Sequence, residues 1–331
     1  MAKADLVNAE LRRGRTDRAV IFRRYGTELT LAAILLCLFI PLSILTPVFL
    51  TAENLSNLIK QSAINGIIAI GMTIVIITGG IDLSVGSIVG LSGVVAALLM
   101  TSGTTPIIAV LVALAVSFAV GLLNAFMIRE GGIAPFIATL GSMTMVRGLV
   151  QLLTNARTIA GLPDSFLSFG NADYLFLPSQ LWVWAILAVI FTIVLTRTRF
   201  GRNIYAIGSS NEVARLSGIS LRFNLYLAYG LGALMAGIGG IVLTARVRMA
   251  APTAGSGYEL YAIAAAVVGG ASLSGASGTI MGSVLGALIM TTIASGGNLL
   301  GVDAFALQIA IGALIVIAVW IDRVRKGKST E

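Results

Sequence analysis

The sequence predicts an all-α protein, a polytopic membrane helix bundle with about ten transmembrane helices. Two observations predict this class. Of the 331 residues, 57% are hydrophobic and only 11% are charged, with a mean hydropathy of +0.98, whereas an ordinary soluble domain carries about 25% charged residues. The apolar residues also fall in runs of about twenty, which is the length that an α-helix needs to cross a bilayer.

The apolar runs place the expected helices in order along the chain. They lie at 29–47, 62–79, 84–102, 106–128, 133–153, 181–196, 224–244, 258–272, 279–296 and 304–321. Two of them are irregular. The run at 133–153 contains Arg147 and Gln151, and the run at 258–272 is short and flanked by glycine. Either one is compatible with a broken or partly buried helix.

The basic residues predict which ends of these helices face the cytoplasm. If the chain starts inside, most of the 22 Lys and Arg residues fall on the cytoplasmic side, and the others are Lys60, Arg147, Arg157, Arg246 and Arg248. Since loops rich in Lys and Arg stay in the cytoplasm, both termini are expected there. The chain then divides into a cytoplasmic basic segment at 1–28, a single transmembrane domain at 29–322 and a cytoplasmic basic tail at 323–331.

The composition argues against several classes of protein. The chain has no His, so the commonest general base and metal ligand are missing, and we expect no catalytic residue and no metal site. The net charge of +8 lies beside apolar helices and does not form a basic face for nucleic acid. Gly327-Lys328-Ser329 resembles the end of a phosphate-binding loop, but Asp322 stands where that motif requires glycine. We therefore expect no cofactor, ATP included, to be bound by this chain.

The polar residues within the predicted helices are mostly neutral. Asn65, Asn124, Gln151 and Asn298 are candidates for lining a translocation path. Ion-coupled carriers retain ionisable groups in the membrane in spite of their cost, whereas neutral amides suit an uncharged polar solute. The alternative is that these amides join helices to one another by hydrogen bonds.

A glycine-bounded turn between 62–79 and 84–102 contains an acidic residue. The candidates for a hinge or gate at its inner mouth are Gly79, Gly80, Asp82, Ser84 and Gly86. Asp82 is expected to cap the following helix, and a cap with no further role is the alternative. The run Gly79 to Ser84 has a faint counterpart in Gly269 to Ser274. Internal repeats are common in transporters, and chance similarity is the alternative.

The loop at 197–222 is basic and too long for a simple hairpin. Asn211-Glu212 places acidic charge at the start of a short predicted helix, and Gly218 provides its end. Such a helix on the membrane surface offers a contact to a cytoplasmic partner. The alternative is a basic loop held at anionic lipid headgroups.

Several motifs in the same order resemble the membrane permease subunits of ribose-type ATP-binding cassette sugar importers. They are Gly71 to Thr73, Thr78 to Ser87, Pro135 to Leu140, Arg215 to Ile219, Pro252 to Leu260 and Asn298 to Val302, within a resemblance that extends from Asn54 to Asp322. The resemblance implies a transport subunit and not an enzyme, in the bacterial inner membrane. It also implies import of a neutral monosaccharide, with ribose or another pentose first and a sugar alcohol next.

The same resemblance implies the partners. They are a second permease subunit, identical or paralogous, two ATPase domains that use ATP and Mg²⁺, and a periplasmic or lipid-anchored sugar-binding protein. The ATPase-coupling loop would comprise Arg202, Glu212, Ala214, Arg215 and Gly218. Val213 replaces an alanine of the family pattern. An ATP-independent secondary sugar or polyol carrier is the alternative function.

Two outer segments, 154–180 and Arg246 to Tyr258, are candidates for docking the binding protein. The candidate charged residues in and beside them are Asp164, Asp173, Arg246, Arg248 and Glu259. We expect Arg246 and Arg248 to face acidic residues on the lobes of the binding protein. The alternative is that the outer segments only cover the mouth of the transporter.

Overall fold

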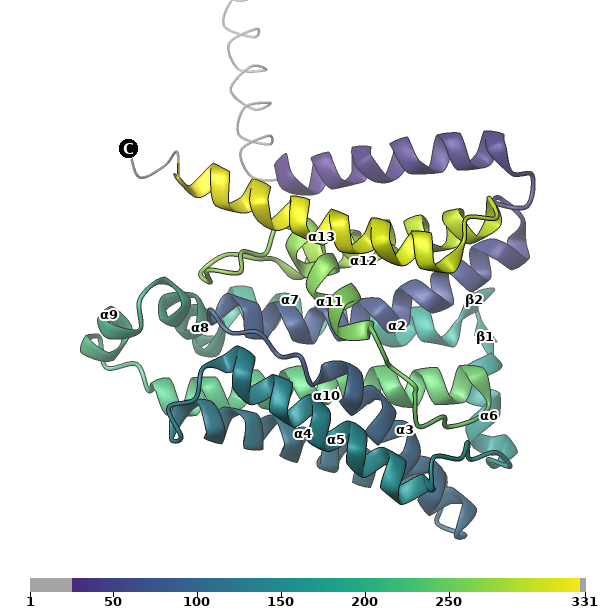
Figure 1. Ribbon diagram of the computed structural model, residues 1–331, viewed down its shortest axis with the longest axis horizontal. Coiled ribbons are helices and arrows are strands. Elements are labelled where there is room, and N and C mark those ends of the chain that lie inside the picture. The colour runs from purple at the N-terminus through teal and green to yellow at the C-terminus, as the bar shows by residue number, and fades with distance from the viewer. Residues whose placement is uncertain (1–25, 328–331) are drawn as a thin grey trace, which may run out of the picture.

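The computed structural model describes residues 26–327, and side chains as far as residue 320. Helices account for most of it (Figure 1). The first helix is Gly26–Leu45. The others are α2 (Ala52–Ile77), α3 (Val85–Thr101), α4 (Pro106–Arg129), α5 (Pro135–Thr154), α6 (Asp164–Asn171), α7 (Ser179–Arg197), α8 (Arg199–Ser209), α9 (Asn211–Leu216), α10 (Leu221–Val247), α11 (Tyr258–Val268), α12 (Ile280–Leu299) and α13 (Ala304–Gly327), with a hairpin of β1 (Asp173–Tyr174) and β2 (Leu177–Pro178).

The predicted fold class is confirmed. Within the described residues, seven helices are long and apolar enough to cross a membrane, and three shorter apolar helices lie at Val85–Thr101, Tyr258–Val268 and Ala304–Trp320. Each predicted run overlaps one of these helices. The number of crossings and their orientation stay predictions, as do the basic segments, which lie mainly outside the described residues.

Two boundaries differ from the prediction. Helix α2 begins at Ala52, well before residue 62, because Thr51 caps it by accepting the backbone N–H of Asn54 and its first turns are polar. Helix α11 ends at Val268, where Gly270 adopts φ +92°. With 11 residues, α11 is about 16 Å long, roughly half of the hydrocarbon core. It is therefore a short helix that does not cross the membrane by itself.

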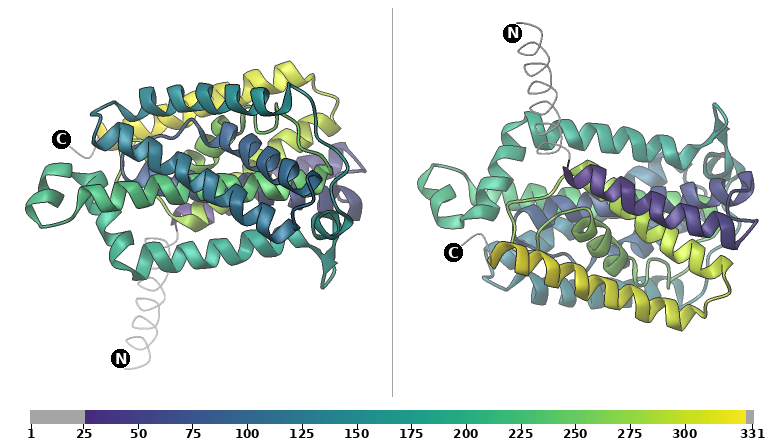
Figure 2. Two further views of the ribbon diagram at one scale, coloured as in Figure 1. Left: turned by 90° about the horizontal axis from the view of Figure 1, so that it is seen from below. Right: turned by 90° about the horizontal axis from the view of Figure 1, so that it is seen from above.

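The core is built around α2, α3 and α10. Helix α10 packs on α2, α3 and α4, while α2 also contacts α7, α11 and α12. Most residues of α2 and α10 are buried, whereas the first helix is mainly exposed. Figure 2 shows α5 and α13 along one side of the bundle and α7 along the opposite side. Exposed apolar side chains on the outer helices are suited to lipid.

The two non-spanning regions lie at opposite ends of the bundle (Figure 1). Helices α8 and α9 form one end, and α6 with the β1–β2 hairpin forms the other. An isolated bridge pairs Ile159 with Ala250 near the second end. The predicted coupling loop and the predicted docking segments are therefore separated by the length of the helices.

Candidate coupling and translocation sites

The predicted coupling loop contains two helices, α8 and α9, where the sequence suggested one short helix. Thr198 caps α8 by accepting the N–H of Gly201, and Ser210 caps α9 by accepting the N–H of Val213. Helix α9 ends before Gly218, which adopts φ +78° and turns the chain back.

The charged residues of this loop are accessible to a partner. Arg202, Glu212 and Arg215 are exposed, whereas Ala214 is buried. Glu212 lies in the first turn of α9 and Arg215 in its last turn. These positions place acidic charge at the positive end of the helix and basic charge at its negative end.

Helix α8 packs directly against the turns that follow α2 and α11. A Cβ atom at Gly208 would overlap the carbonyl oxygen of Ile77 and the amide nitrogen of Ala276. These two backbone groups also bond to each other, with the N–H of Ala276 donating to the oxygen of Ile77 at 3.0 Å. Because backbone atoms surround Gly208, α8 contacts both turns with no intervening side chain.

A side chain of α8 strengthens the same contact. The Tyr205 hydroxyl donates to the carbonyl oxygen of Gly278 at 2.7 Å. Burial raises the pKa of this hydroxyl, so it remains a neutral donor at physiological pH. Neither Tyr205 nor Gly208 was singled out from the sequence, since no polar motif marks either residue.

The turn after α2 holds a fully buried carboxylate. Oδ1 of Asp82 accepts the N–H of Ser84 at 2.9 Å and its hydroxyl at 2.6 Å. Ser84 itself occupies the N-cap position of α3 and makes no side-chain cap there. The carboxylate therefore holds the turn that precedes α3, and the simple cap predicted for Asp82 is wrong in this respect.

Three other helices contact this turn. From α4, Nδ2 of Asn124 donates to the Ser84 hydroxyl oxygen at 2.8 Å and lies 3.4 Å from both Asp82 oxygens. From α5, the Thr139 hydroxyl donates to the carbonyl oxygen of Ile81 at 3.2 Å. From α10, the Tyr229 hydroxyl lies against Gly80. We call Asp82, Ser84, Asn124, Thr139 and Tyr229 the Asp82 cluster.

The Asp82 cluster also contains unpaired polar atoms. Among the described residues, Oδ1 of Asn124 and the hydroxyl of Tyr229 are buried without a hydrogen-bond partner. A buried polar atom without a partner raises the free energy of the state that contains it. The cluster therefore has spare hydrogen-bonding capacity that a different arrangement of these helices would satisfy.

The two similar sequence runs form similar turns. Each follows a helix and contains a hydrogen bond between residues two apart, from Ser84 to Asp82 at 2.6 Å and between the Ser272 and Ser274 hydroxyls at 3.0 Å. The turns also meet, because a Cβ atom at Gly275 would lie 3.0 Å from the amide nitrogen of Gly79. The resemblance is therefore one of local structure, and duplication of the two halves stays a prediction.

The four path candidates do not form one group. Asn65 is buried and donates to the Thr291 hydroxyl on α12 at 3.1 Å, which is a helix-packing contact. Asn124 belongs to the Asp82 cluster. Gln151 and Asn298 are exposed.

The docking candidates lie near the end formed by α6, with one difference. Asp164, Asp173 and Arg248 are exposed and Arg246 is half-buried. Glu259 points inward instead: Oε1 accepts the N–H of Gly257 at 3.2 Å, while Oε2 is buried against Gly86. Glu259 is therefore not one of the exposed charges, and Gly86 lies against Glu259 and is not part of the Asp82 cluster.

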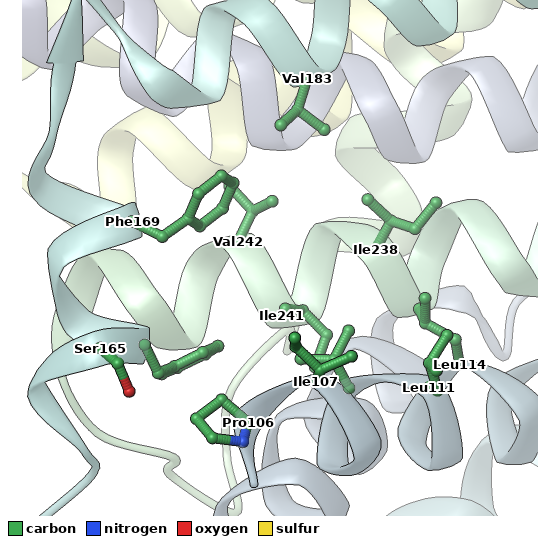
Figure 3. Close-up of a pocket in the computed structure, with 12 residues that line it drawn as sticks. Pro106, Ile107, Leu111, Leu114, Ser165, Phe169, Val183, Ile238, Ile241 and Val242 are labelled. Carbon is green, nitrogen blue, oxygen red and sulfur yellow. The ribbon is translucent and has the colours of Figure 1, made fainter.

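An open hollow of about 370 Å³ lies between α4, α6, α7 and α10 (Figure 3). Its wall is almost wholly apolar and includes Ile107, Phe169 and Ile238. A sugar needs hydrogen-bonding groups that this wall does not provide. We therefore do not place the translocation path there.

Comparison with known proteins identifies the family. The family described as "Branched-chain amino acid transport system / permease component" matches residues 54–319. The ribose import permease protein of Bacillus subtilis (strain 168) is 44% identical over 291 residues, which cover 87% of this chain and 90% of that protein. The ribose import permease protein of Escherichia coli (strain K12) is 40% identical over 316 residues, or 93% and 98% of the two chains.

A further relative is named for a different sugar. The D-allose transport system permease protein of Escherichia coli (strain K12) is 38% identical over 306 residues, which cover 92% of this chain and 93% of that protein. No solved structure matches the chain. The chain belongs to the branched-chain amino acid transport-system permease family and is a multi-pass transport subunit, not an enzyme.

Proposed function

We propose that the chain is the membrane permease subunit of an ATP-binding cassette importer for a neutral monosaccharide, with D-ribose as the first candidate. Relatives that cover nearly the whole chain are named for import of ribose and transport of D-allose. The membrane helices carry amides more than ionisable groups, which suits an uncharged polyhydroxylated solute. The complex would lie in the bacterial inner membrane.

The partners follow from the same proposal. A second permease subunit, identical or paralogous, two ATPase domains and a periplasmic or lipid-anchored sugar-binding protein would complete the importer. The ATPase domains would dock on α8 and α9, whose Arg202, Glu212 and Arg215 are exposed. ATP and Mg²⁺ would be bound by those domains.

The contact of α8 with both turns is the observation that carries the proposal. Around Gly208 the backbones of α8, Ile77 and Ala276 leave no room for a Cβ atom. A displacement of α8 by a cytoplasmic partner must therefore move the ends of α2 and α11, because close-packed backbone cannot absorb it. A loop that only binds lipid headgroups would not need this packing.

The Asp82 cluster extends the movement to other helices. Its hydrogen bonds join the turn after α2 to α4 through Asn124 and to α5 through Thr139. Helix α10 contacts the same turn through Tyr229. The turn would thus transmit a displacement of α8 to the helices around it.

Reconstitution tests the proposal. The purified chain is placed in liposomes alone, and then with the ATPase and the sugar-binding protein encoded by neighbouring genes, and uptake of labelled D-ribose is measured. We expect uptake only with all components and ATP. Uptake by the chain alone, driven by the sugar gradient, would support a secondary carrier instead, and the complete complex failing on a panel of pentoses, hexoses and polyols would overturn the proposed substrate class.

A further inference from the structure

Arg147 is an ionisable residue inside a membrane helix. It lies in α5, about two turns from the end of that helix. Placing a charged side chain at this depth is costly, so such a residue normally pairs with another group or lines an aqueous path. None of the sites described above accounts for it.

Carbonyl oxygens before α11 fix the position of this side chain. Nη1 of Arg147 donates to the oxygen of Ala254 at 2.7 Å and to that of Pro252 at 3.1 Å. A guanidinium group carries five N–H donors, and two carbonyl contacts leave Nε and Nη2 available. Within residues 26–320, these remaining donors bond to no protein group. The guanidinium group is therefore anchored on one side and free on the other.

The negative charge of Glu259 acts on Arg147 without direct contact between the two groups. The two groups interact electrostatically, but they form no ion pair within the described residues. Nη1 of Arg147 packs against Gly90, and Oε2 of Glu259 packs against Gly86. These glycines lie one turn apart on α3, which corresponds to about 6 Å along the helix. The carboxylate stabilises the guanidinium charge and does not occupy its free donors.

The free side of Arg147 belongs to a polar strip on α5. Thr144, Gly148 and Gln151 lie one turn or less from Arg147 and are exposed, and Gly148 has open space where a Cβ atom would stand. Large apolar side chains are also exposed on α5, among them Met145 and Leu152, as they are on α4, so the polar strip is a narrow part of the α5 surface. Apolar side chains suit lipid, whereas a strip with a guanidinium group requires water or another protein chain.

Helix α5, which carries the polar strip, lies on the same side of the bundle as α11 and α13 (Figure 1). Figure 1 shows α5 and α13 on the near side of the bundle, with the short helix α11 between them. The segment before α11 exposes Thr253 and Ser256. Helix α11 is too short to cross the membrane by itself. We therefore expect a second permease subunit to cover this side of the bundle. The polar groups would then line the space between the two subunits.

We propose that Arg147 contacts the sugar during translocation, and that Glu259 is a positioning residue whose charge helps to orient the guanidinium group. The inference rests on the proposed function, since it requires a sugar in the path. The free Nε and Nη2 donors form a planar fork that matches two neighbouring hydroxyl oxygens of a monosaccharide. The sugar hydroxyls accept these hydrogen bonds while water is excluded around them.

The test compares Arg147→Gln with Arg129→Gln in the complete complex in liposomes. Arg129 is an exposed arginine in the last turn of α4, outside the coupling loop and the docking segments, and serves as the matched control. D-Ribose uptake and binding-protein-stimulated ATP hydrolysis are both measured, normalised to the amount of complex. We expect Arg147→Gln to lower uptake by about tenfold or more, the effect of losing a charge-assisted hydrogen bond, while stimulated ATP hydrolysis stays within about twofold. Arg129→Gln should change neither.

Two further variants distinguish direct contact with the sugar, proposed for Arg147, from the positioning role proposed for Glu259. Glu259→Gln should lower uptake less than Arg147→Gln, and the double variant should be no worse than Arg147→Gln alone, because both changes act through one guanidinium group. If the complex with Arg147→Gln fails to assemble, uptake is measured with Arg147→Lys instead. This variant keeps the positive charge and should retain part of the uptake.

Three results would overturn the inference. The first is unchanged uptake in Arg147→Gln. The second is an equal loss of uptake and of stimulated ATP hydrolysis, which is expected if Arg147 only holds the structure together. The third is that the effects of Arg147→Gln and Glu259→Gln are additive in the double variant. Failure of the wild-type complex to transport D-ribose would instead count against the proposed function, so the two failures are distinguishable.

Discussion

At the scale of single residues, the Asp82 cluster shows how a buried acid is retained at low cost. The carboxylate is fully buried, yet it accepts two hydrogen bonds from Ser84 and lies close to the Asn124 amide. Hydrogen bonds to a charged group compensate for lost solvation when they are short and well placed. The same bonds join the turn to α4, so the acid links two elements as well as shaping one turn.

Substitution of Asp82 tests whether this cluster acts in transport. Asp82→Ala leaves the N–H and the hydroxyl of Ser84 without their acceptor, and we expect a loss of about 1–3 kcal/mol in stability together with lower uptake. Asp82→Asn keeps an acceptor for Ser84 but sets an amide donor against Asn124, so it should be stable and still impaired in uptake. Thermal unfolding of the purified chain and D-ribose uptake measure the two effects. Full uptake in Asp82→Asn, with only reduced expression in Asp82→Ala, would rule out a gate and leave a purely structural turn.

Residues that act through long-range packing were the ones that the sequence did not reveal. Asp82 stood out because it is an acid between glycines in an apolar chain. Tyr229 and Gly208 did not, because a tyrosine and a glycine within helices carry no local signal, and their importance depends on Gly80 and Ile77 being brought beside them by the fold.

At the scale of elements, the predicted coupling loop combines an exposed helix with one that packs on the bundle. Helix α9 presents Glu212 and Arg215 to solvent, while α8 packs its Tyr205 and Gly208 against the two turns. An exposed helix can bind a partner, and a helix packed on the bundle can pass a displacement on. The order of the two helices therefore suits transmission from a partner subunit to the membrane helices.

Charge reversal in α9 tests this division of roles. Glu212→Lys places a positive charge at the positive end of the helix, which costs about 0.3–1 kcal/mol locally and alters the surface that the ATPase would meet. We expect normal insertion into the membrane and normal docking of the binding protein. D-Ribose uptake should fall, and ATP hydrolysis should no longer be coupled to it. Val213→Ala, a neutral change at a neighbouring exposed position, is the control. Normal transport by Glu212→Lys would remove α9 from the coupling mechanism.

The elements were predictable where a single physical property dominates. Long apolar runs located the helices, because no other structure satisfies backbone hydrogen bonds in lipid. The start of α2 was missed because its first turns, including Glu53 and Lys60, are polar although helical. The division of the loop at Ser210 was missed because a cap within a polar loop has no hydropathy signal.

At the scale of the whole molecule, the two ends proposed to bind partners are joined by a closely packed core. The coupling loop forms one end, and the exposed charges of the predicted docking segments lie towards the other (Figure 1). Between them, α2, α3 and α10 are closely packed, with glycines such as Gly71 and Gly232 in direct contact. Such packing moves as rigid segments, so a movement at one end can alter the opening at the other.

The most direct test of the account is the number of D-ribose molecules imported per ATP hydrolysed. It is measured for the complete complex carrying Gly208→Val, with Gly312→Val as control. A side chain at Gly208 must displace α8 from Ile77 and Ala276, whereas Gly312 has open space around it. The account predicts that Gly208→Val lowers the ratio by about tenfold or more while ATP hydrolysis persists, and that Gly312→Val leaves the ratio unchanged. An unchanged ratio in a correctly assembled Gly208→Val complex would contradict coupling through α8.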